Sequence, residues 1–471
     1  MGLIEDMLNP KAVAFIGATE REGSIGQQIM KNLLKGKDRR PIYPVNIRRE
    51  SVMGIKCFPS ITEVPNHVNL AIIATPAKTV PKIVDECGQS GVDGVVIISA
   101  GFGETGEDGL KLEMEIKSLC EKHSLRLLGP NCLGFIRPHI SLNAAFSRSD
   151  PKPGEIAFIS QSAALGSAML DWAVSSQIGF SMFASLGSML DIDFGEIIDY
   201  LGQDPHTRSI LIYMEGVGSA KRFVNAARAF ARSKPIIILK SGKYTVSAKA
   251  ARSHVGALAG SYKAYDAAFK RLGVLRVDEI EDLFNCASVL SSRHLPKGPR
   301  LVIVSNAGGP GVMAADAVID YGGEVAELSP ESMIALDNYL PPYWSRGNPM
   351  DLLEEATAER YKKVLEVCLA DPNADGVIVI YTPQPSIQPN DLAKVIIDMA
   401  KKKIKPILTV WMGGAESDKQ REMFYSNDVP TYPTPEKAIR TYMYMYKYKQ
   451  NLELLYETPE ELRTDLLPPK T

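Results

Sequence analysis

Residues 12–34 read AVAFIGATEREGSIGQQIMKNLL, and this stretch predicts the fold of the N-terminal part of the chain. Its opening apolar run is typical of a buried strand, and the residues after the glycines have the composition of a helix. Gly17, Gly23 and Gly26 permit a tight turn, and a helix that begins there offers N–H groups to a phosphate. We therefore expect a strand, a turn and a helix that together hold a phosphorylated ligand.

Short β-branched runs alternate with longer helical stretches along the chain, which favours parallel, doubly wound sheets covered by helices on both faces. The first series of expected strands lies at 12–17, 42–46, 70–75, 94–99 and 125–129. The second series lies at 156–160, 210–215, 235–240 and 273–277. The third series lies at 301–306, 376–381 and 406–414.

Two stretches that contain Pro separate these series. Residues 137–155 (RPHISLNAAFSRSDPKPGE) read as an ordered connection that leaves the first unit near residue 135, and residues 293–300 (RHLPKGPR) are the clearest linker. Residues 443–471 predict a closing helix and a polar end. The sequence therefore predicts an α/β protein with three domains, at residues 1–130, 131–296 and 297–471.

The charge balance argues against binding to nucleic acid or to a membrane surface. The 471 residues include 53 basic and 55 acidic side chains, for a net charge of −2, so there is no overall basic field. No uncharged apolar run approaches the about 20 residues that span a bilayer. The N-terminus also lacks the basic and apolar segments of a secretion signal. We expect a soluble, cytoplasmic protein.

Metal chemistry is not expected either. The six cysteines are scattered without a C-x-x-C pair, and the six histidines show no H-E-x-x-H spacing. The cysteine pattern predicts buried thiols in a reducing compartment and no structural zinc.

The end of the second expected strand favours a ligand with a phosphorylated ribose. Gly26 comes nine positions after Gly17, a spacing that is too loose for the dinucleotide fingerprint. A nicotinamide enzyme also needs Asp or Glu after this strand, whereas the chain has Asn46-Ile47-Arg48-Arg49. Basic residues there suit the 3′-phosphate of coenzyme A (CoA) or the phosphate of NADP, and both remain open. A solvated surface turn is the alternative without a ligand.

Small residues also follow two later strands of the first series. Ala74-Thr75-Pro76 and Ser99-Ala100-Gly101-Phe102-Gly103 would let a ligand lie across the sheet edge. Ordinary connecting loops are the alternative interpretation.

The second and third series each begin with a strand that runs into a helix start of small residues. These starts are Ser160-Gln161-Ser162-Ala163-Ala164-Leu165-Gly166 and Ala307-Gly308-Gly309-Pro310-Gly311-Val312-Met313. Amide groups at the positive end of a helix form a bed for an anion. Plain N-capping is the alternative for the serines. Neither start has the Lys-Ser/Thr of a P-loop, so a nucleoside triphosphate is not expected there.

His254 lies in a run of small residues, SHVGALAGS (253–261), and Lys240-Ser241-Gly242-Lys243 precede it. A neutral imidazole is a competent nucleophile near neutral pH, because its unperturbed pKa is about 6.5. The other ring nitrogen needs an acceptor, and Glu215 is the best-placed carboxylate because it ends the strand at 210–215. A solvated histidine and a surface glutamate are the alternatives.

Together these segments resemble the nucleoside-diphosphate-forming acyl-CoA synthetases, relatives of succinyl-CoA synthetase, and especially the α subunit of ADP-forming acetyl-CoA synthetases. The likeness covers nearly the whole chain, in the order VAFIGATEREGSIG, GPNCLGF (129–135), IAFISQSAALGSAMLDWA, YMEGV (213–217), SHVGALAGS and VSNAGGPGVMAADA (304–317). It implies an N-terminal Rossmann-like CoA-binding domain followed by two flavodoxin-like domains.

The resemblance also implies roles for particular residues. In that family a histidine that becomes phosphorylated matches His254, and a glutamate that steadies it matches Glu215. The two helix starts that flank the phosphate match Gln161-Ser162-Ala163 and Gly308-Gly309. CoA is expected at Gly17, Ala18, Thr19, Ser24, Ile25, Gly26, Asn46, Arg48, Ala74, Thr75, Pro76, Ser99, Ala100, Gly101 and Asn131.

The implied reaction converts acyl-CoA, ADP and phosphate reversibly into free acid, CoA and ATP, through an acyl phosphate and phospho-His254. Acetyl-CoA and acetate are the default substrates by resemblance, and the acid is left open. The ATP-grasp domains of the family have no counterpart in this sequence. The resemblance therefore implies a β subunit with that fold, which holds ADP or ATP with Mg²⁺, in a heterotetramer of two α and two β subunits.

Two other functions compete with this interpretation. A non-catalytic, CoA-binding regulatory or scaffold protein could share the fold, but it would need neither His254 nor Glu215. An NADP-dependent oxidoreductase is disfavoured by the loose glycine spacing and by the missing acidic ribose ligand.

Overall fold

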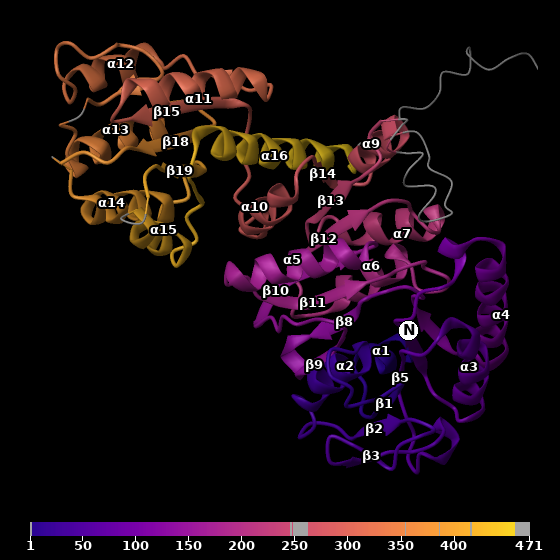
Figure 1. The fold of residues 1–471 in the computed structure, drawn as a ribbon. Helices are drawn as coiled ribbons and strands as arrows, with labels where there is room; N and C mark the ends of the chain where they lie inside the picture. The colour runs from indigo at the N-terminus through magenta and orange to yellow at the C-terminus, as the bar shows by residue number, and fades with distance from the viewer. Residues whose placement is uncertain are drawn as a thin grey trace, which may run out of the picture. The chain divides into compact units, whose positions relative to one another are not determined.

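The structure is a computed structural model that describes residues 2–244, 247, 262–353, 355–385, 387–414 and 417–456. Three sheets, most of whose strands run parallel, follow one another along these residues (Figure 1), which confirms the predicted α/β class. Contacts divide the described chain into two compact units. The first holds two sheets, runs to Leu283 and includes residues 454–456, and the second is Phe284–Glu453.

The first sheet has five parallel strands in the order β2-β1-β5-β6-β7, and all five were predicted. The strands are β1 (Val13–Ile16), β2 (Ile42–Val45), β5 (Leu70–Ile73), β6 (Gly94–Ile97) and β7 (Arg126–Leu128). The α-helices are α1 (Gly2–Leu8), α2 (Ile25–Leu34), α3 (Val80–Gln89) and α4 (Glu107–His123). The smaller elements are the hairpin β3 (Ser51–Val52) and β4 (Ile55–Lys56) and the 3₁₀ turns η1 (Ile61–Glu63), η2 (Ala77–Thr79) and η3 (Gly103–Thr105).

Strand β1 is apolar at every position because both faces of its sheet are covered. Val13 and Phe15 belong to the core cluster that includes Ile29 of α2. Ala14 and Ile16, which point the other way, belong to a second cluster that includes residues of α3 and α4. Helices therefore cover both faces, as expected for a doubly wound sheet.

The second sheet has seven strands in the order β14-β13-β12-β10-β11-β8-β9. The strands are β8 (Gly134–Arg137), β9 (Leu142–Ala145), β10 (Pro153–Ser160), β11 (Phe180–Ser185), β12 (Ser209–Met214), β13 (Ile236–Lys240) and β14 (Leu275–Val277). The turn η4 (Pro138–Ile140) lies between β8 and β9. The helices are α5 (Ala163–Ser175), α6 (Phe194–Gln203), α7 (Ala220–Phe230), α9 (Tyr262–Arg271) and α10 (Ile280–Ser291).

Strands β8 and β9 are a difference from the sequence-based prediction. Residues 137–155 were expected as a connection, but the chain forms an antiparallel ribbon that begins at Gly134 and pairs through β8 with β11, with Gly134 opposite Ser185. Pro138 and Ser141, which has a φ of 53°, make the turn between the two strands. Each strand has only four residues, so the run is too short and too interrupted for its period to be visible.

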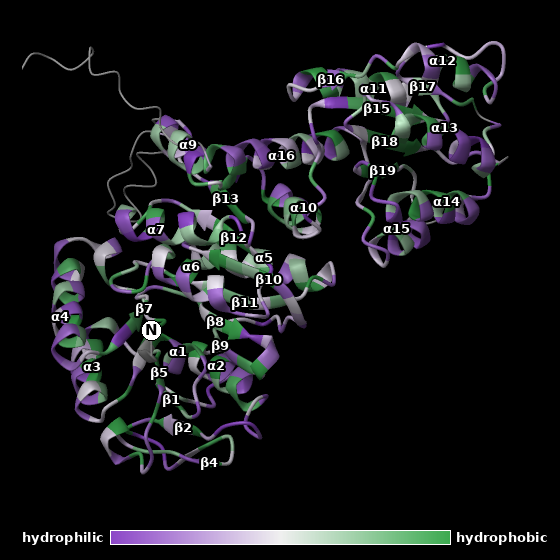
Figure 2. Ribbon diagram, turned by 180° about the vertical axis from the view of Figure 1, so that it is seen from behind, coloured by the Kyte–Doolittle hydropathy of each residue, from purple (hydrophilic) through white to green (hydrophobic). Residues whose placement is uncertain are grey.

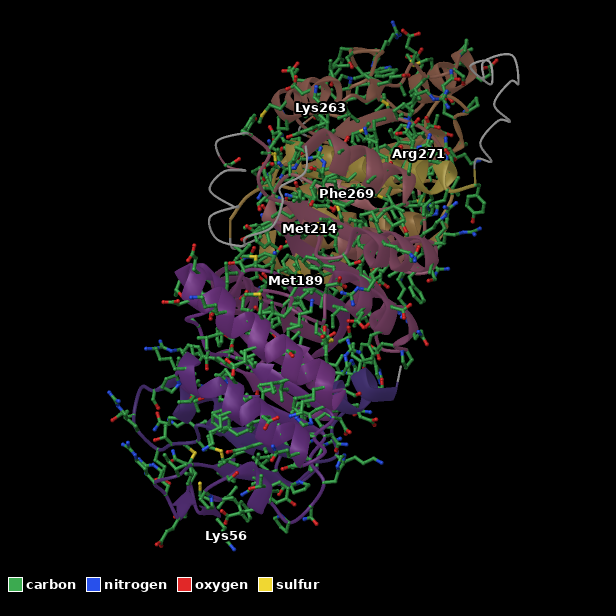
Figure 3. All side chains as sticks on the ribbon, turned by 90° about the vertical axis from the view of Figure 1, so that its right-hand side faces the viewer. Lys56, Met189, Met214, Lys263, Phe269 and Arg271 are labelled. Carbon is green, nitrogen blue, oxygen red and sulfur yellow. The ribbon has the colours of Figure 1, made fainter. Side chains whose placement is uncertain are left out.

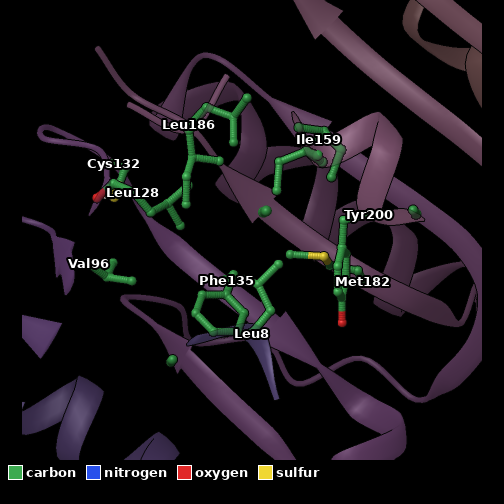
Figure 4. Close-up of a cluster of buried hydrophobic side chains, with 14 of the residues drawn as sticks. Leu8, Val96, Leu128, Cys132, Phe135, Ile159, Met182, Leu186 and Tyr200 are labelled. Carbon is green, nitrogen blue, oxygen red and sulfur yellow. Dashed lines mark hydrogen bonds between the residues drawn. The ribbon is translucent and has the colours of Figure 1, made fainter. Parts of the chain in front are cut away.

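One hydrophobic core cluster continues from the first sheet into the second (Figure 4). It includes Leu8 of α1 and Val96 of β6 on one side, and Phe135 of β8, Ile159 of β10 and Met182 of β11 on the other. This shared core explains why the first two sheets form one compact unit.

The third sheet has six strands, five of them in the order β16-β15-β18-β19-β20, and β17 pairs with β15. The strands are β15 (Arg300–Ser305), β16 (Glu324–Val325), β17 (Met350–Asp351), β18 (Gly376–Tyr381), β19 (Ile407–Trp411) and β20 (Thr431–Tyr432). The helices are α11 (Gly308–Asp320), α12 (Pro330–Asp337), α13 (Ala358–Ala370), α14 (Pro389–Lys401), α15 (Asp418–Tyr425) and α16 (Pro435–Leu454). The three predicted strands are confirmed, and α16 confirms the closing helix.

The second unit has its own core. Trp411 is fully buried and stacks on Tyr381 at 4.2 Å between ring centroids, with Phe424 at its edge. Figure 2 shows hydrophobic residues gathered on central strands such as β15 and β18, and hydrophilic residues on the outer sides of the helices. None of the helices in the described ranges is both long and apolar enough to cross a membrane.

Candidate active site

Each of the three sheets brings predicted site residues to the same kind of place. In each, the strand that leads into a small-residue helix start lies between two later strands: β1 between β2 and β5, β10 between β11 and β12, and β15 between β16 and β18. The connections leave this central strand in opposite directions, so the helices diverge and a crevice opens at the carboxyl end. Ligands of open α/β sheets bind in such crevices.

In the first sheet, glycines let helix α2 begin close to β1. Gly17 has a φ of 100°, and a Cβ there would lie 2.5 Å from the carbonyl oxygen of Ala74. A Cβ on Gly26 would lie 2.4 Å from the carbonyl oxygen of Gly17. Ser24 caps α2, because its side chain accepts a hydrogen bond from the N–H of Gln27. This packing requires glycine at both positions and places the first turn of α2 at the crevice.

The end of β2 lies beside this turn. The side-chain amide of Asn46 donates to the carbonyl of Ala18 at 2.8 Å and accepts from the N–H of Arg48 at 2.9 Å. The side chains of Ile47 and Arg48 are exposed. Thr19 follows Ala18 in the same turn, and its hydroxyl accepts from the N–H of Arg21. A solvent-accessible cation at this edge can bind a ligand phosphate.

Ser99 joins the ends of the next strands. Its hydroxyl donates to the carbonyl of Thr75 at 2.5 Å and accepts from the N–H of Thr75 at 3.1 Å, and its carbonyl accepts from the N–H of Asn131 at 3.0 Å. Three predicted CoA positions, from the ends of β5, β6 and β7, are therefore joined directly. Of their neighbours, Pro76 precedes η2, Ala100 is exposed and Gly101 has a φ of 108°.

In the second sheet, Gln161 uses its hydrogen bonds to hold the next strand end. Its side-chain oxygen accepts from the N–H groups of Glu215 and Gly216 at 2.8 and 2.9 Å, and its own N–H donates to the carbonyl of Tyr213. Gln161 is 4% exposed, and its side-chain nitrogen has no hydrogen-bond partner among the described residues. Both partners of the oxygen are donors, so the orientation of the amide is fixed.

Ser162 and Ala163 follow Gln161 directly and begin helix α5. Ser162 is the N-cap, and its hydroxyl accepts from the N–H of Leu165 at 3.3 Å. The hydroxyl of Ser160 donates to the carbonyl of Ser162 at 2.7 Å, which fixes the turn between the strand and the helix. The amides of the first helical turn have no partner within the helix and are suited to an anion.

Glu215 lies at the end of β12 and is half-buried. The hydroxyl of Tyr213 donates to its carboxylate at 3.3 Å. Burial raises the pKa of Tyr213, so this hydroxyl remains protonated and keeps its role as donor. Most of the hydrogen bonds of Glu215 therefore involve its main chain, and its carboxylate can accept a hydrogen bond from another partner.

Lys240, to which the sequence analysis gave no role, lies beside Glu215. Its ammonium lies at the end of β13, is largely buried, and donates to the carbonyl of Glu215 at 2.9 Å. Burial lowers the pKa of Lys240, whereas the charge of Glu215 opposes this shift. The only signal in the sequence is a lysine that closes the apolar run PIIILK, at the strand end next to Glu215.

The third sheet repeats the arrangement of the second. The hydroxyl of Ser305 donates to the carbonyl of Ala307 at 2.8 Å, just as the hydroxyl of Ser160 donates to the carbonyl of Ser162. The buried amide of Asn306 accepts from the N–H of Thr382, at the end of the next strand, and donates to its carbonyl, both at 2.8 Å. Asn306 therefore corresponds to Gln161. The turns that lead into α5 and α11 are therefore built in the same way.

A cavity of about 790 Å³ opens at the start of α11. Gly308 and Gly309 line it together with Asn306, Tyr343 and Asp351. A Cβ on Gly308 would lie 3.2 Å from a carboxylate oxygen of Asp351. The predicted phosphate-binding glycines therefore border a cavity that also carries a carboxylate, which the sequence did not indicate.

His254 and its loop fall on residues that lie outside the described ranges. Strand β13 ends at Lys240 before this loop, and helix α9 begins at Tyr262 after it. Within the described residues, no group of three His, Cys, Asp or Glu side chains could hold a metal ion.

The chain matches three family profiles in order. These are a CoA binding domain at residues 11–138, a succinyl-CoA ligase like flavodoxin domain at 153–290 and a ligase-CoA domain at 301–455. Two curated relatives cover almost all of it. The ADP-forming acetate–CoA ligase I subunit alpha of Pyrococcus furiosus is 40% identical over 455 residues, which are 95% of this chain and 98% of the relative. The ADP-forming acetate–CoA ligase I of Archaeoglobus fulgidus is 40% identical over 95% of this chain, which spans 64% of that longer protein.

A solved structure has the same fold over nearly the full length. The dinucleotide forming acetyl-coenzyme A synthetase 1 of Ca. Korarchaeum cryptofilum, in complex with phosphate and ADP, matches with a TM-score of 0.87. It is 35% identical, and the match covers 97% of this chain and 98% of that one. The chain therefore belongs to the nucleoside-diphosphate-forming acyl-CoA synthetases, the family that contains the ADP-forming acetate–CoA ligases.

Proposed function

We propose that this chain is the catalytic α subunit of an ADP-forming acetate–CoA ligase. The reaction converts acyl-CoA, ADP and phosphate reversibly into the free acid, CoA and ATP. The observation that carries the proposal is the place of Glu215: it directly follows β12 at the crevice of the second sheet, beside the helix start at Gln161 and Ser162. The relatives named as acetate–CoA ligases give the substrate class.

CoA binds to the first sheet in this proposal. The first turn of α2 and the cation of Arg48 receive its phosphates, and the joined loops at Thr75, Ser99 and Asn131 border the rest of the molecule. Residues 1–130 form the CoA-binding domain, residues 131–296 carry the phosphohistidine loop, and residues 297–471 form the second flavodoxin-like domain.

The chemistry passes through two intermediates. Phosphate attacks the thioester carbonyl and releases CoA as its thiol, which leaves an acyl phosphate. A ring nitrogen of His254 then attacks the phosphorus, and the acid leaves as a carboxylate. Glu215 accepts a hydrogen bond from the other ring nitrogen of His254 and stabilises its positive charge. The amides at Ser162 and Ala163 and at Gly308 and Gly309 balance the phosphate charge.

The second half of the reaction needs a partner subunit. Phospho-His254 passes its phosphoryl group to ADP, which a β subunit with an ATP-grasp fold holds with Mg²⁺. The name of the Pyrococcus relative as a subunit alpha and the longer Archaeoglobus relative support such a partner. We place the complex in the cytoplasm as a heterotetramer of two α and two β subunits, and the six buried cysteine thiols suit a reducing compartment.

The test uses the chain without its partner. The purified chain is mixed with acetyl-CoA and labelled phosphate, and the label on the protein is followed. We expect an acid-labile, alkali-stable label that maps to residues 243–262, together with release of CoA. A chain that binds CoA but takes up no label would instead be a scaffold or sensor, and the proposal would be wrong.

His254→Ala is the first variant to examine. We expect it to bind CoA with unchanged affinity, measured by calorimetry, and to take up no label. ATP formation in the presence of the β subunit should also be lost. ATP formation at the wild-type rate by this variant would contradict the assignment of His254.

A further inference from the structure

Lys240 is a buried cation that the proposed chemistry does not use. Its side chain ends β13, and the residue is 7% exposed. The ammonium donates to the carbonyl of Glu215 at 2.9 Å and to the carbonyl of Ser241 at 2.5 Å. It also lies 4.7 Å from the centre of the Tyr265 ring. Two carbonyl oxygens and one aromatic face therefore surround the charge.

Burying a lysine is costly, so the surrounding groups must compensate for lost water. Burial lowers the pKa of Lys240, and the charge of Glu215 opposes this shift. Tyr265 is held in place because it packs on Phe269, a buried residue of α9 that also contacts Phe223. Figure 3 labels Phe269 and also Met214, the residue before Glu215 on β12. The cation is thus enclosed by fixed elements of the first unit.

The contacts of Lys240 and Gln161 meet at one residue. Gln161 accepts from the N–H of Glu215 and from that of Gly216, and Lys240 donates to the carbonyl of Glu215. The peptide groups on both sides of Glu215 are therefore held by side chains at the ends of β10 and β13, the two strands that flank β12. A residue whose N–H and carbonyl are both fixed has little freedom in its backbone dihedrals, so the direction in which its side chain leaves the backbone is fixed as well.

We propose that Lys240 is a positioning residue for phosphoryl transfer, which orients Glu215 and supplies the positive charge that accompanies its carboxylate. This inference rests on the proposed function of Glu215. A neutral residue at position 240 would leave the carbonyl of Glu215 without its donor. It would also leave the negative charge of Glu215 uncompensated where a phosphate must bind. The phosphorylation step is therefore the one that suffers, whereas the CoA-binding crevice belongs to the first sheet.

Lys234 offers a matched control because it is built in the same way near the other end of β13. Its ammonium donates to the carbonyls of Leu201 and Asp204 at 2.7 and 2.6 Å. Burial lowers the pKa of Lys234, and the charge of Asp204 opposes this shift. A lysine-to-methionine substitution removes two carbonyl contacts at either position, together with a charge that is buried at Lys240 and half-buried at Lys234. Of the two lysines, only Lys240 contacts Glu215.

The experiment compares label uptake from acetyl-CoA and labelled phosphate in single turnovers of the full chain. We expect Lys240→Met to lower the maximal rate at least tenfold, with the half-saturating concentration of acetyl-CoA unchanged. Lys234→Met should label within twofold of the wild type, although its thermal midpoint falls by a similar amount. Lys240→Arg, which keeps the charge and two donors, should recover at least half of the lost rate on a logarithmic scale.

The outcomes separate the two hypotheses. A wild-type chain that takes up no label would overturn the proposed function and this inference with it. A labelled wild type combined with an undisturbed Lys240→Met overturns the inference alone. Equal losses in the two methionine variants, or a folded Lys240→Arg as slow as Lys240→Met, would show a merely structural role. If Lys240→Met does not fold, Lys240→Gln, which removes the charge and retains an NH₂ donor group, gives the comparison for the charge.

Discussion

Glu215 owes its orientation to bonds of its main chain. Its N–H and carbonyl are both engaged by buried side chains, whereas its carboxylate receives one described hydrogen bond, at 3.3 Å from Tyr213. The backbone of Glu215 is thus fixed, and its carboxylate is still able to accept a hydrogen bond from an imidazole. This division of roles suits a group that must recognise a side chain carried by another segment.

Glu215→Gln should slow the uptake of label by about 10–100-fold. The variant loses a hydrogen bond to a charged group, and such a bond contributes about 1.5–3 kcal/mol. The amide keeps the shape of the side chain, so the thermal midpoint should change little. Single-turnover labelling measures the effect. Glu155→Gln is the matched control, since Glu155 forms an exposed ion pair with Arg208 in the same sheet. Equal rates for wild type and Glu215→Gln would reduce Glu215 to a surface acid.

The sequence indicated some of these residues and not others, for physical reasons. Glu215 and Gln161 were visible because each closes an apolar strand, and strand ends of parallel sheets gather at one edge. Lys240 was not, because a lysine at a strand end is usually exposed, and its burial depends on the carbonyls and the aromatic ring around it. The position of the Asp351 carboxylate beside Gly308 depends on the pairing of β17 with β15. Strand β17 has only two residues, which is too short for a recognisable pattern in the sequence.

At the scale of elements, close approach between helix and strand makes each crevice. Helix α2 begins beside β1 only because position 26 carries no side chain: an added Cβ would lie 2.4 Å from a backbone oxygen. In the second and third sheets a serine hydroxyl fixes the corresponding turn, through Ser160 and Ser305. The same crevice is thus built in two ways, with glycine in the first sheet and with serine in the others.

Gly26→Ala should move the first turn of α2 and weaken CoA binding at least tenfold. The obstacle is a backbone atom, so we expect a loss of about 1–3 kcal/mol in the free energy of unfolding as well, as for other overpacked sites. Calorimetric titration with CoA and thermal unfolding give the two values. Lys31→Ala, on the exposed side of the same helix, should change each by less than about 0.5 kcal/mol. Unchanged CoA affinity in Gly26→Ala would exclude this crevice as the binding site.

The strands that the sequence revealed are those buried on both faces. Their apolar runs, such as AVAFIG and GVIVIY, are continuous and therefore conspicuous. Strand β11 reads FSMFAS, with two serines that break the run, although all six residues are buried. The ribbon of β8 and β9 is interrupted after four residues, and β16, β17 and β20 have two each. Pairing with neighbours, rather than local pattern, determines these strands.

At the scale of the whole molecule, the described chain has two compact units with separate cores. Arg300, at the start of β15, anchors the second unit through two side-chain hydrogen bonds to Asp375, at 2.8 and 3.1 Å. Burial alone would raise the pKa of Asp375, but the hydrogen bonds and the charge of Arg300 hold it below its ordinary value. Asp375 is 6% exposed, so solvent screens this pair only in part.

Acid should therefore destabilise the second unit. Because the folded pKa of Asp375 lies below the unfolded value of about 3.9, its contribution is complete above that value and is lost as the pH falls through the folded pKa. Calorimetric unfolding between pH 7 and pH 2 follows this loss. Asp375→Asn should cost about 2–3 kcal/mol at pH 7, less than a fully buried pair because Arg300 is partly exposed, and should flatten the acid dependence. Asp391→Asn, in an exposed pair with Lys394, should do neither, and a similar acid curve for both variants would contradict this account.

The ribbon of β8 and β9 connects the first sheet and its helices to the second sheet, so the two cannot be exchanged independently. Its β8 strand pairs with β11 of the second sheet, while the amide of Asn32 on α2 donates to the carbonyls of Ala145 and Ser147 at 3.0 and 2.7 Å. A chimaera that exchanges the N-terminal module between homologues must therefore inherit α2 and the ribbon from one parent. A crossover between α2 and the ribbon would combine an Asn32 and a ribbon that did not evolve together and would disturb these hydrogen bonds. We therefore expect homologues to change their CoA-binding properties through substitutions in individual loops.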